Sequence, residues 1–323
     1  MILIITLNPI LERRFYYDRV NYGSVNRNAQ AKISAGGKGI NVSRQLKKFG
    51  IKSYNYIFSG GVNGKIYRDA LKTEGLEFSS VNTKSETRHA ALIISEYEKK
   101  ISSYFSEDTN ILQAEVEEFK FKLDKMIQNC EIVIFSGSSP SNETDSIIPY
   151  GIELANKYDK VSICDTYGRH LENCINASPT LLHNNLLEIN SSLNITLNDE
   201  KSKTDFLLIL YHKNIKRVFL TDGSNNFYAS NFDYIFNIKP LKVNEIDPTG
   251  SGDCFVAGIT KGWINSDLFE ESLKFSTAVA GLNAESFEVA SITLEDANKI
   301  KNCVEVAPVG KKTKTIDDSP REI

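Results

Sequence analysis

The stretch Asp247-Pro248-Thr249-Gly250-Ser251-Gly252-Asp253-Cys254-Phe255-Val256-Ala257-Gly258 follows an extended run and opens an apolar segment of helical spacing. Gly250 and Gly252 have no Cβ, so the backbone can adopt positive φ and its N–H groups can approach an anion closely. The helix that follows would direct its unpaired N-terminal amides and the positive end of its dipole at the same point. The pattern predicts a phosphate-binding turn made by Gly250, Ser251 and Gly252.

Asp253 places a carboxylate at the mouth of this predicted anion site. Its negative charge is unfavourable beside a bound anion, which indicates a function for the residue. We expect it to accept the proton of a hydroxyl that attacks a phosphoryl group. The structural alternative is a helix cap, because aspartate is a favoured N-cap residue. The adjacent Cys254 could act as a nucleophile, but no histidine lies near it in the sequence to activate it.

A second glycine-rich stretch, Gly36-Gly37-Lys38-Gly39-Ile40-Asn41, precedes apolar residues spaced by four and three positions. This spacing predicts a helix that begins just behind the glycines and stops at Gly50. The paired glycines permit close approach of the backbone to a ligand, while Lys38 and Asn41 offer a cation and an amide at one end of the helix. The alternative is a solvated basic helix start without a ligand.

The composition is that of an ordinary globular protein: 323 residues, 41% hydrophobic, 24% charged, with a net charge of −3. This charge disfavours a general nucleic-acid-binding protein, which would carry a basic face. No secretory signal is predicted, and no apolar run approaches the ~20 residues of a membrane helix. The five cysteines form no C-x-x-C pair, so we expect reduced thiols in a cytoplasmic protein that binds no membrane.

Strands and helices are predicted to alternate along most of the chain, with strands at 2–7, 132–135 and 161–165 among others. This order predicts an α/β fold with a mostly parallel sheet, whose ligands collect at the carboxyl ends of the strands. Ser136 and Gly137 follow one such strand, so we expect them at the same edge as the Gly250 turn. Residues 15–20 and 29–34 are predicted to be half-exposed strands, and 87–94 with 101–105 a hairpin-like pair.

The two glycine-rich stretches resemble the paired motifs of the PfkB (ribokinase-like) family of carbohydrate kinases. Asp247, Gly250, Gly252 and Asp253 match D-T-x-G-x-G-D, with Pro248 in the usual threonine place, and residues 36–44 match G-G-K-G-x-N-V-[AS]-R. The resemblance implies a three-layer α/β/α domain over 1–310, with a small β-sheet lid formed by about 11–35 and 86–108. We expect 311–323 to be a flexible tail.

Three further segments of the sequence resemble nucleotide-side motifs of the family. Leu181 to Glu188 matches K-P-N-x-x-E in part, with His183 for the lysine and Asn184 for the proline. By resemblance, Asn185 and Glu188 hold the water shell of Mg²⁺, although the two could also form a helix-start pair without a metal. The resemblance also assigns Thr221 and Gly223 to the adenine and ribose, and Asn283 to the nucleotide.

Five short segments resemble the branch of this family that contains 1-phosphofructokinase and tagatose-6-phosphate kinase: Thr6–Pro9, Asn26-Arg27, Gly36–Lys38, Thr87-Arg88 and Ser136–Ser138. This branch uses ATP and Mg²⁺ to phosphorylate a sugar phosphate. The cations Arg27, Lys38 and Arg88 would neutralise the phosphate already present. The resemblance also implies substrate contacts at Glu12, which stands where the branch usually has aspartate, and at Gly36, Gly37, Asn41, Ser136 and Gly137.

The sequence leaves two other functions open: a sugar-phosphate-binding regulator with weak or no turnover on the same fold, and a kinase for a neutral sugar. A Rossmann dehydrogenase is set aside, because no G-x-G-x-x-G follows the first strand. Which hexose phosphate is used, whether a monovalent cation assists, and whether the lid forms a homodimer stay open at this point.

Overall fold

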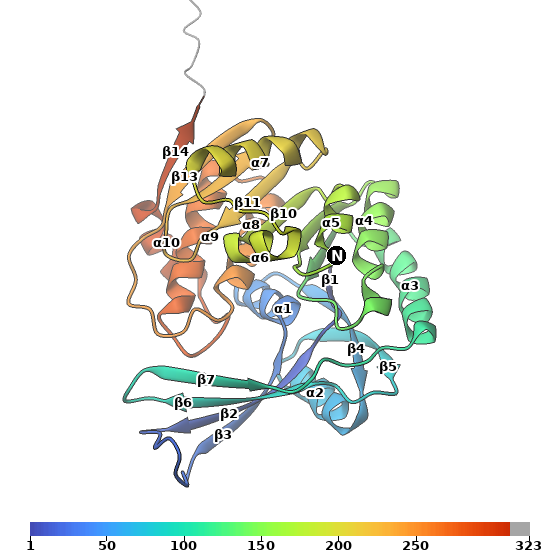
Figure 1. The fold of residues 1–323 in the computed structure, drawn as a ribbon, viewed down its shortest axis with the longest axis vertical. Helices are drawn as coiled ribbons and strands as arrows, with labels where there is room; N and C mark the ends of the chain where they lie inside the picture. Colours follow the sequence, from blue (N-terminus) through green and yellow to red (C-terminus); the bar gives the residue numbers. More distant parts are fainter. Residues whose placement is uncertain (311–323) are drawn as a thin grey trace, which may run out of the picture.

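The computed structural model describes residues 1–310, which form two β-sheets with helices packed against them (Figure 1). In these residues the large sheet has ten strands, in the order β14-β13-β12-β11-β10-β9-β8-β1-β4-β5. They are β1 (Ile2–Thr6), β4 (Ser53–Gly60), β5 (Glu77–Thr83), β8 (Ile132–Ser136), β9 (Val161–Asp165), β10 (Leu181–Asn185), β11 (Arg217–Thr221), β12 (Phe227–Asn231), β13 (Tyr234–Lys239) and β14 (Glu305–Val309). Neighbours from β11 to β5 pair in parallel, and β12, β13 and β14 continue the sheet as antiparallel strands.

Helices cover both faces of this sheet, so that three layers form. One face packs against α3 (Gln113–Gln128), α4 (Ile147–Lys157), α5 (Leu171–Asn176), α6 (Leu186–Leu193) and α7 (Glu200–His212). The other packs against α1 (Lys38–Lys48), α8 (Ser251–Ile264), α9 (Phe269–Ala284) and α10 (Leu294–Ile300). The predicted alternation of strands and helices in an α/β fold is confirmed.

The strand β1 shows why the central strands are apolar along their whole length. Leu3 and Ile5 belong to the core under α3 and α4, whereas Ile2 and Ile4 belong to the core under α1 and α8. Successive side chains of a strand point to opposite faces, so a strand buried on both faces needs a continuous apolar run rather than an alternating one.

The small sheet has the strand order β3-β2-β6-β7 and extends past α1 in Figure 1, apart from the large sheet. Its strands are β3 (Gln30–Gly36), β2 (Ile10–Tyr17), β6 (His89–Ser95) and β7 (Lys100–Phe105). The base of this sheet joins α2 (Gly61–Thr73) in a separate apolar cluster that includes Leu11 and Tyr67. The predicted small sheet is confirmed.

Three further predictions concern the small sheet and the end of the chain. Closure of the sheet over a ligand and a homodimer formed through it stay predictions. The predicted tail 311–323 lies outside the described residues. Within 1–310, no helix combines the length and the apolar character that a membrane crossing requires.

The fold brings the two glycine-rich stretches to one edge of the large sheet. Because β13 pairs antiparallel with β12, and β12 antiparallel with β11, β13 ends at the same edge as β11. The loop after β13 therefore delivers the Gly250 turn to the carboxyl ends of the parallel strands. The first turn of α1 faces this place, since α1 and α8 pack side by side on one face of the sheet.

Candidate active site

A cavity of about 540 Å³ lies at this edge, between the large sheet and the base of the small one. Its wall combines the N-terminal turns of α1 and α8, the strand ends after β10 and β11, and the segment 240–250. Many of the residues expected at the site line it: Glu12, Gly37, Lys38, Asn41, Arg88, Asn185, Glu188, Thr221, Gly223, Gly250, Ser251, Gly252 and Asp253.

The turn before α8 has the form expected of an anion site. Gly250 is the N-cap residue with φ of 79°, and a Cβ there would lie 2.3 Å from Val289 Cγ1. A side chain at this position is therefore excluded by both conformation and space. Within residues 1–310, the backbone amides of Gly250, Gly252 and Asp253 have no hydrogen-bond acceptor, and all three residues line the cavity. Such amides can bind an anion together with the helix dipole.

Asp253 lies in the first turn of α8 and is only 3% exposed. The N-cap alternative for this residue is wrong, because Gly250 occupies that position. The carboxylate instead accepts a hydrogen bond of 2.7 Å from Asn41 Nδ2 on α1. Burial, together with the charges of Asp165 and Glu188, raises the pKa of Asp253 to about 7, although Lys38 and the Asn41 hydrogen bond oppose that rise. A pKa near neutrality suits a general base.

Lys38, the first residue of α1, lies among three carboxylates. Its Nζ is 2.7 Å from Glu188 Oε1 and 3.6 Å from Asp165 Oδ1. Burial would lower the pKa of this ammonium, but the charges of Asp165, Glu188 and Asp253 outweigh that effect and raise the pKa above its ordinary value. The lysine therefore stays charged and can meet an anionic ligand in the cavity that it lines.

Asp165, at the end of β9, was not among the predicted site residues. It is fully buried and accepts hydrogen bonds from Ser136 Oγ at 2.7 Å and from His183 Nδ1 at 2.9 Å. Burial would raise the pKa of this carboxyl, but Lys38 and His183 lower it, so Asp165 is ionised. Its place at the carboxyl end of a predicted strand was the signal that could have identified it. Tyr167, whose ring centroid lies 4.9 Å from Lys38 Nζ, was also missed.

Ser136 and Gly137 support the site from behind and do not line the cavity. Besides the bond from Ser136 Oγ, the amide of Gly137 donates to the carbonyl of Asp165 at 2.9 Å. His183 does line the cavity, and its Nε2 lies 3.3 Å from Thr221 Oγ1. Asp165 thus connects β8, β10 and α1 through its side chain and backbone.

Asn185 and Glu188 form the helix-start pair that the sequence left open. Asn185 Oδ1 accepts from the amide of Glu188 at 2.8 Å, and Glu188 Oε2 accepts from the amide of Asn185 at 3.1 Å. This is a capping box at the start of α6. Both residues nevertheless line the cavity, where Glu188 presents its second oxygen to Lys38.

Arg88 reaches the cavity from the base of the small sheet. It donates to Asp108 Oδ1 at 2.9 Å and to the carbonyl of Asn8 at 3.1 Å, which fixes its guanidinium. Arg27 is exposed on the connection between β2 and β3, at the tip of the small sheet, and does not line the cavity. Only two of the three cations expected at the site therefore meet there.

Glu12 lines the cavity, but its carboxylate is already engaged by its neighbours. Glu12 Oε2 accepts hydrogen bonds from Arg14 Nε at 2.9 Å and from Ser34 Oγ at 3.3 Å. Gly36 packs directly behind it, because a Cβ at Gly36 would lie 2.4 Å from Glu12 Oε1. Gly36 itself does not line the cavity, so its closeness serves Glu12 rather than a ligand.

Asn283 and Cys254 lie beneath the turn rather than in the cavity. Asn283 is fully buried on α9 and donates from Nδ2 to the carbonyl of Thr249 at 2.8 Å and to Ser251 Oγ at 3.2 Å. It supports the turn and does not line the cavity. Cys254 is fully buried, and burial raises the pKa of its thiol well above the ordinary value. The nucleophile alternative for Cys254 is therefore wrong.

Comparisons with known proteins give the same family as the motifs. A family model described as pfkB family carbohydrate kinase matches residues 4–296. A tagatose-6-phosphate kinase of Staphylococcus epidermidis is 30% identical over 312 residues, covering 96% of this chain and 100% of the relative.

Two solved structures share the fold. A possible 1-phosphofructokinase from Thermotoga maritima has a TM-score of 0.87 at 24% identity, with 96% of this chain and 100% of that chain covered. Phosphofructokinase-2 from Escherichia coli, in complex with substrates and products, has a TM-score of 0.82 at 20% identity, with 94% and 98% covered. These likenesses show that the architecture is ribokinase-like.

The fold and the family model together define a phosphotransferase that acts on an alcohol acceptor. The chain belongs to the pfkB family of carbohydrate kinases, as its two glycine-rich motifs predicted.

Proposed function

We propose that this chain transfers the γ-phosphoryl group of ATP to a hydroxyl of a ketohexose monophosphate, tagatose 6-phosphate or fructose 1-phosphate, and so makes a bisphosphate. The observation that carries the proposal is that Asp253, the free amides of its turn, Lys38 and Arg88 all line one cavity. The 30% identity over 312 residues to a tagatose-6-phosphate kinase supports the same substrate class.

The transfer needs a base for the hydroxyl and donors for the moving phosphoryl group. A sugar oxygen forms a bond to the γ-phosphorus, the bond from that phosphorus to the β–γ bridging oxygen breaks, and ADP leaves with the electron pair. Asp253 takes the proton of the hydroxyl. The amides of Gly250, Gly252 and Asp253 stabilise charge on the transferring oxygens, in a buried place where such donors act strongly.

The cations at the cavity favour a substrate that is already charged. Arg88 presents a guanidinium fixed by Asp108 and by the carbonyl of Asn8, so little side-chain entropy is lost when it binds a phosphate. Lys38 lies nearer to Asp253 and its turn, where the transferred group would pass. A neutral sugar has no phosphate for Arg88 to bind.

The residues present fit a magnesium ion that arrives with ATP, because Mg²⁺ in kinases is held by one or two carboxylates and by substrate phosphates. Glu188 would contribute its carboxylate and Asn185 its side-chain amide. Both residues lie at the start of α6 and line the cavity. Such an ion would neutralise charge on the ATP oxygens. Glu188 also keeps Lys38 in place through the 2.7 Å contact, independently of any metal.

The function is tested by measuring ADP release with a panel of acceptors. We expect turnover with tagatose 6-phosphate or fructose 1-phosphate, and about 10–100-fold lower kcat/KM with the unphosphorylated sugars, because a lost charged contact costs about 1.5–3 kcal/mol. Binding of either sugar phosphate by calorimetry without ADP release would favour the regulator instead. Equal turnover of the neutral sugars would favour the neutral-sugar kinase.

Arg88→Ala is expected to raise KM for the sugar phosphate by about 10–100-fold with a smaller change in kcat, since it removes a charge-assisted contact made to the bound substrate. Steady-state kinetics with varied sugar phosphate measure this change. Arg68→Ala is the matched control, because Arg68 on α2 donates to Ser59 Oγ at 2.8 Å and does not line the cavity. An unchanged KM in Arg88→Ala would remove Arg88 from phosphate binding.

A further inference from the structure

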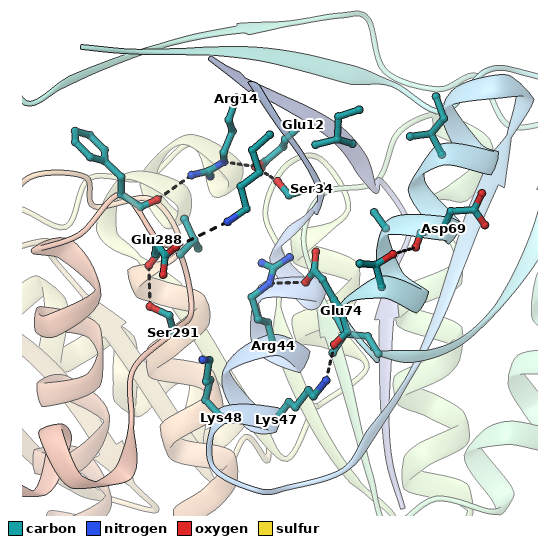
Figure 2. A pocket seen from close by; sticks show the side chains of 18 of the residues that line it. Glu12, Arg14, Ser34, Arg44, Lys47, Lys48, Asp69, Glu74, Glu288 and Ser291 are labelled. Carbon is teal, nitrogen blue, oxygen red and sulfur yellow. Dashed lines mark hydrogen bonds and ion pairs between the residues drawn. The ribbon is translucent and has the colours of Figure 1, made fainter. Parts of the chain in front are cut away.

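A second cavity, of about 740 Å³, is lined by the later residues of α1, whereas Lys38 and Asn41 from its start line the candidate active site. The small sheet, α1, α2 and the segment 287–291 enclose it (Figure 2). Its wall includes many charged side chains, among them Arg14, Lys32, Arg44, Lys47, Lys48 and Glu74. Arg44 is the one of these that contacts Asn41, the residue that donates to Asp253 in the active-site cavity.

All three nitrogen positions of the Arg44 guanidinium are hydrogen-bonded. Nε donates to Glu74 Oε2 at 2.8 Å, and Figure 2 shows these two side chains facing each other between α1 and α2. Nη2 donates to the carbonyl of Ala35 at 2.7 Å. Nη1 donates to Asn41 Oδ1 at 2.8 Å, one turn earlier on α1. The arginine is therefore held at two points outside the active site and reaches the site at a third.

The contact with Arg44 decides which way the Asn41 amide faces. A guanidinium has five donors and no acceptor, so the Asn41 atom opposite Nη1 must be the oxygen. The amide nitrogen then points the other way, and it donates to Asp253 Oδ2 at 2.7 Å. Asn41 is only 8% exposed, so water gives it little alternative hydrogen bonding. The chain of contacts runs from Glu74 through Arg44 and Asn41 to Asp253.

We propose that Arg44 is a positioning residue for the phosphoryl transfer, which it serves by holding the Asn41 amide with its N–H groups toward Asp253. The inference rests on the proposed role of Asp253 as the base. No other residue in 1–310 forms a side-chain hydrogen bond to Asn41 Oδ1, so the orientation of the amide depends on this arginine.

Loss of Arg44 would free the Asn41 amide to turn, and its oxygen could then face the carboxylate. An oxygen repels ionised Asp253 but accepts a hydrogen bond from the neutral acid, so the turned amide favours the form that cannot act as a base. The other groups around Asp253 are Lys38 from α1, Asp165 from β9 and Glu188 from α6. Asn41 is the side chain whose hydrogen bond lowers the pKa of Asp253, and this contribution would be lost or reversed.

The experiment is a double-mutant cycle on kcat as a function of pH, with Arg44→Met, Asn41→Ala and both together. We expect Arg44→Met to move the rising limb by about 0.5–1 pH unit upward, the size of one lost hydrogen bond, and so to lower kcat at pH 7 by about 2–6-fold. The same Arg44→Met change should have little further effect on kcat when Asn41 is alanine, because the contact through which Arg44 acts is then already missing.

Lys47→Met is the matched control, because Lys47 lies on the same helix and contacts the carbonyls of Glu74 and Gly75 but not Asn41. It should leave the pH midpoint unchanged even where it lowers the melting temperature. A merely structural Arg44 would behave like Lys47, with a lower melting temperature and an unmoved midpoint. That result, or equal shifts in both Asn41 backgrounds, would overturn the inference.

Arg44→Lys keeps the cycle informative if Arg44→Met does not fold. A single ammonium can reach Glu74 or Asn41 but not reproduce the planar fork, so we expect a smaller shift that again disappears in Asn41→Ala; no shift overturns the inference. Asp253→Asn separates the two proposals. Full turnover in Asp253→Asn would refute the proposed base itself. Loss of turnover in Asp253→Asn, together with an unchanged pH midpoint of kcat in Arg44→Met, would refute only the role of Arg44.

Discussion

Asp253→Asn is expected to lower kcat by about 10²–10⁴-fold while the protein stays folded, because general bases contribute about that much. The asparagine keeps the size of the side chain, and its oxygen can still accept the hydrogen bond from Asn41 Nδ2 that Asp253 accepts at 2.7 Å. It cannot take the proton of the sugar hydroxyl. Steady-state ADP release with saturating substrates measures the change, and KM for both substrates should change far less than kcat.

The pH dependence of kcat in the unaltered chain is a second test of the role of Asp253. The base must be ionised, so kcat should rise as pH increases through about 7, the pKa that burial gives Asp253. Asp253→Asn should lose this limb and keep a low, flat residual activity. Asp222→Asn is the control: Asp222 lies beside Thr221 near the cavity, 3.9 Å from Lys203, and is not among its lining residues. Turnover of Asp253→Asn within about threefold of the unaltered enzyme would refute the assignment, since threefold is under 1 kcal/mol.

The stability of Asp253→Asn should change in the opposite direction from its activity. The pKa of about 7 in the folded chain lies above the ordinary value of 3.8, so the folded state holds the proton more tightly than the unfolded state does. The contribution of this carboxyl to stability is therefore complete at acidic pH below the unfolded value and is lost as pH rises toward 7. We expect Asp253→Asn to melt at the same temperature as the unaltered chain at pH 4 and at a higher one at pH 8.

Residues whose chemistry depends on a neighbouring stretch of chain could be predicted from the sequence. The turn before α8 needs Gly250 in a left-handed conformation and free amides behind it, and both requirements are local. The alternation of apolar strands and helices placed the end of β8 and the start of α8 at one edge of the sheet. The family motif then identified Lys38 and Asn41 on the facing helix.

Residues whose surroundings come from distant parts of the chain could not be assigned in this way. Asp165 reads as the last residue of an apolar strand, and its bonds to Ser136 and His183 exist only after three strands align. Arg27 lies close in sequence to the site residue Glu12, yet the β2–β3 connection carries it to the exposed tip of the small sheet. Periodicity places a residue on a face of an element but does not say which other elements meet that face.

Lys38 shows that the site, rather than the helix, determines the residue at the start of α1. A cation in the first turn of a helix opposes the helix dipole, and α1 has no acidic residue in that turn to offset it. The compensation comes from Glu188 at 2.7 Å and Asp165 at 3.6 Å, on two other elements. The charge of Lys38 is thus balanced by the active-site carboxylates rather than by its own helix.

Lys38→Met should therefore be the most damaging single change outside Asp253, with kcat/KM lower by at least about 10²-fold, since one lost charged contact and one suppressed base act together. Methionine fills a similar volume but leaves Asp165, Glu188 and Asp253 without their cation. Because Lys38 lowers the pKa of Asp253, its loss raises that pKa further above about 7 and leaves less of the base ionised at neutral pH.

The two consequences of Lys38→Met can be separated by pH. The part of the loss that comes from protonated Asp253 should recover as the assay is made more alkaline, so the midpoint of kcat should move upward by about one unit or more. The part that comes from the missing cation should persist as a raised KM at every pH. Lys48→Met, at the other end of the same helix and outside this cavity, should show neither effect. A Lys38→Met enzyme with an unmoved midpoint would mean that the lysine binds substrate without controlling the charge of Asp253.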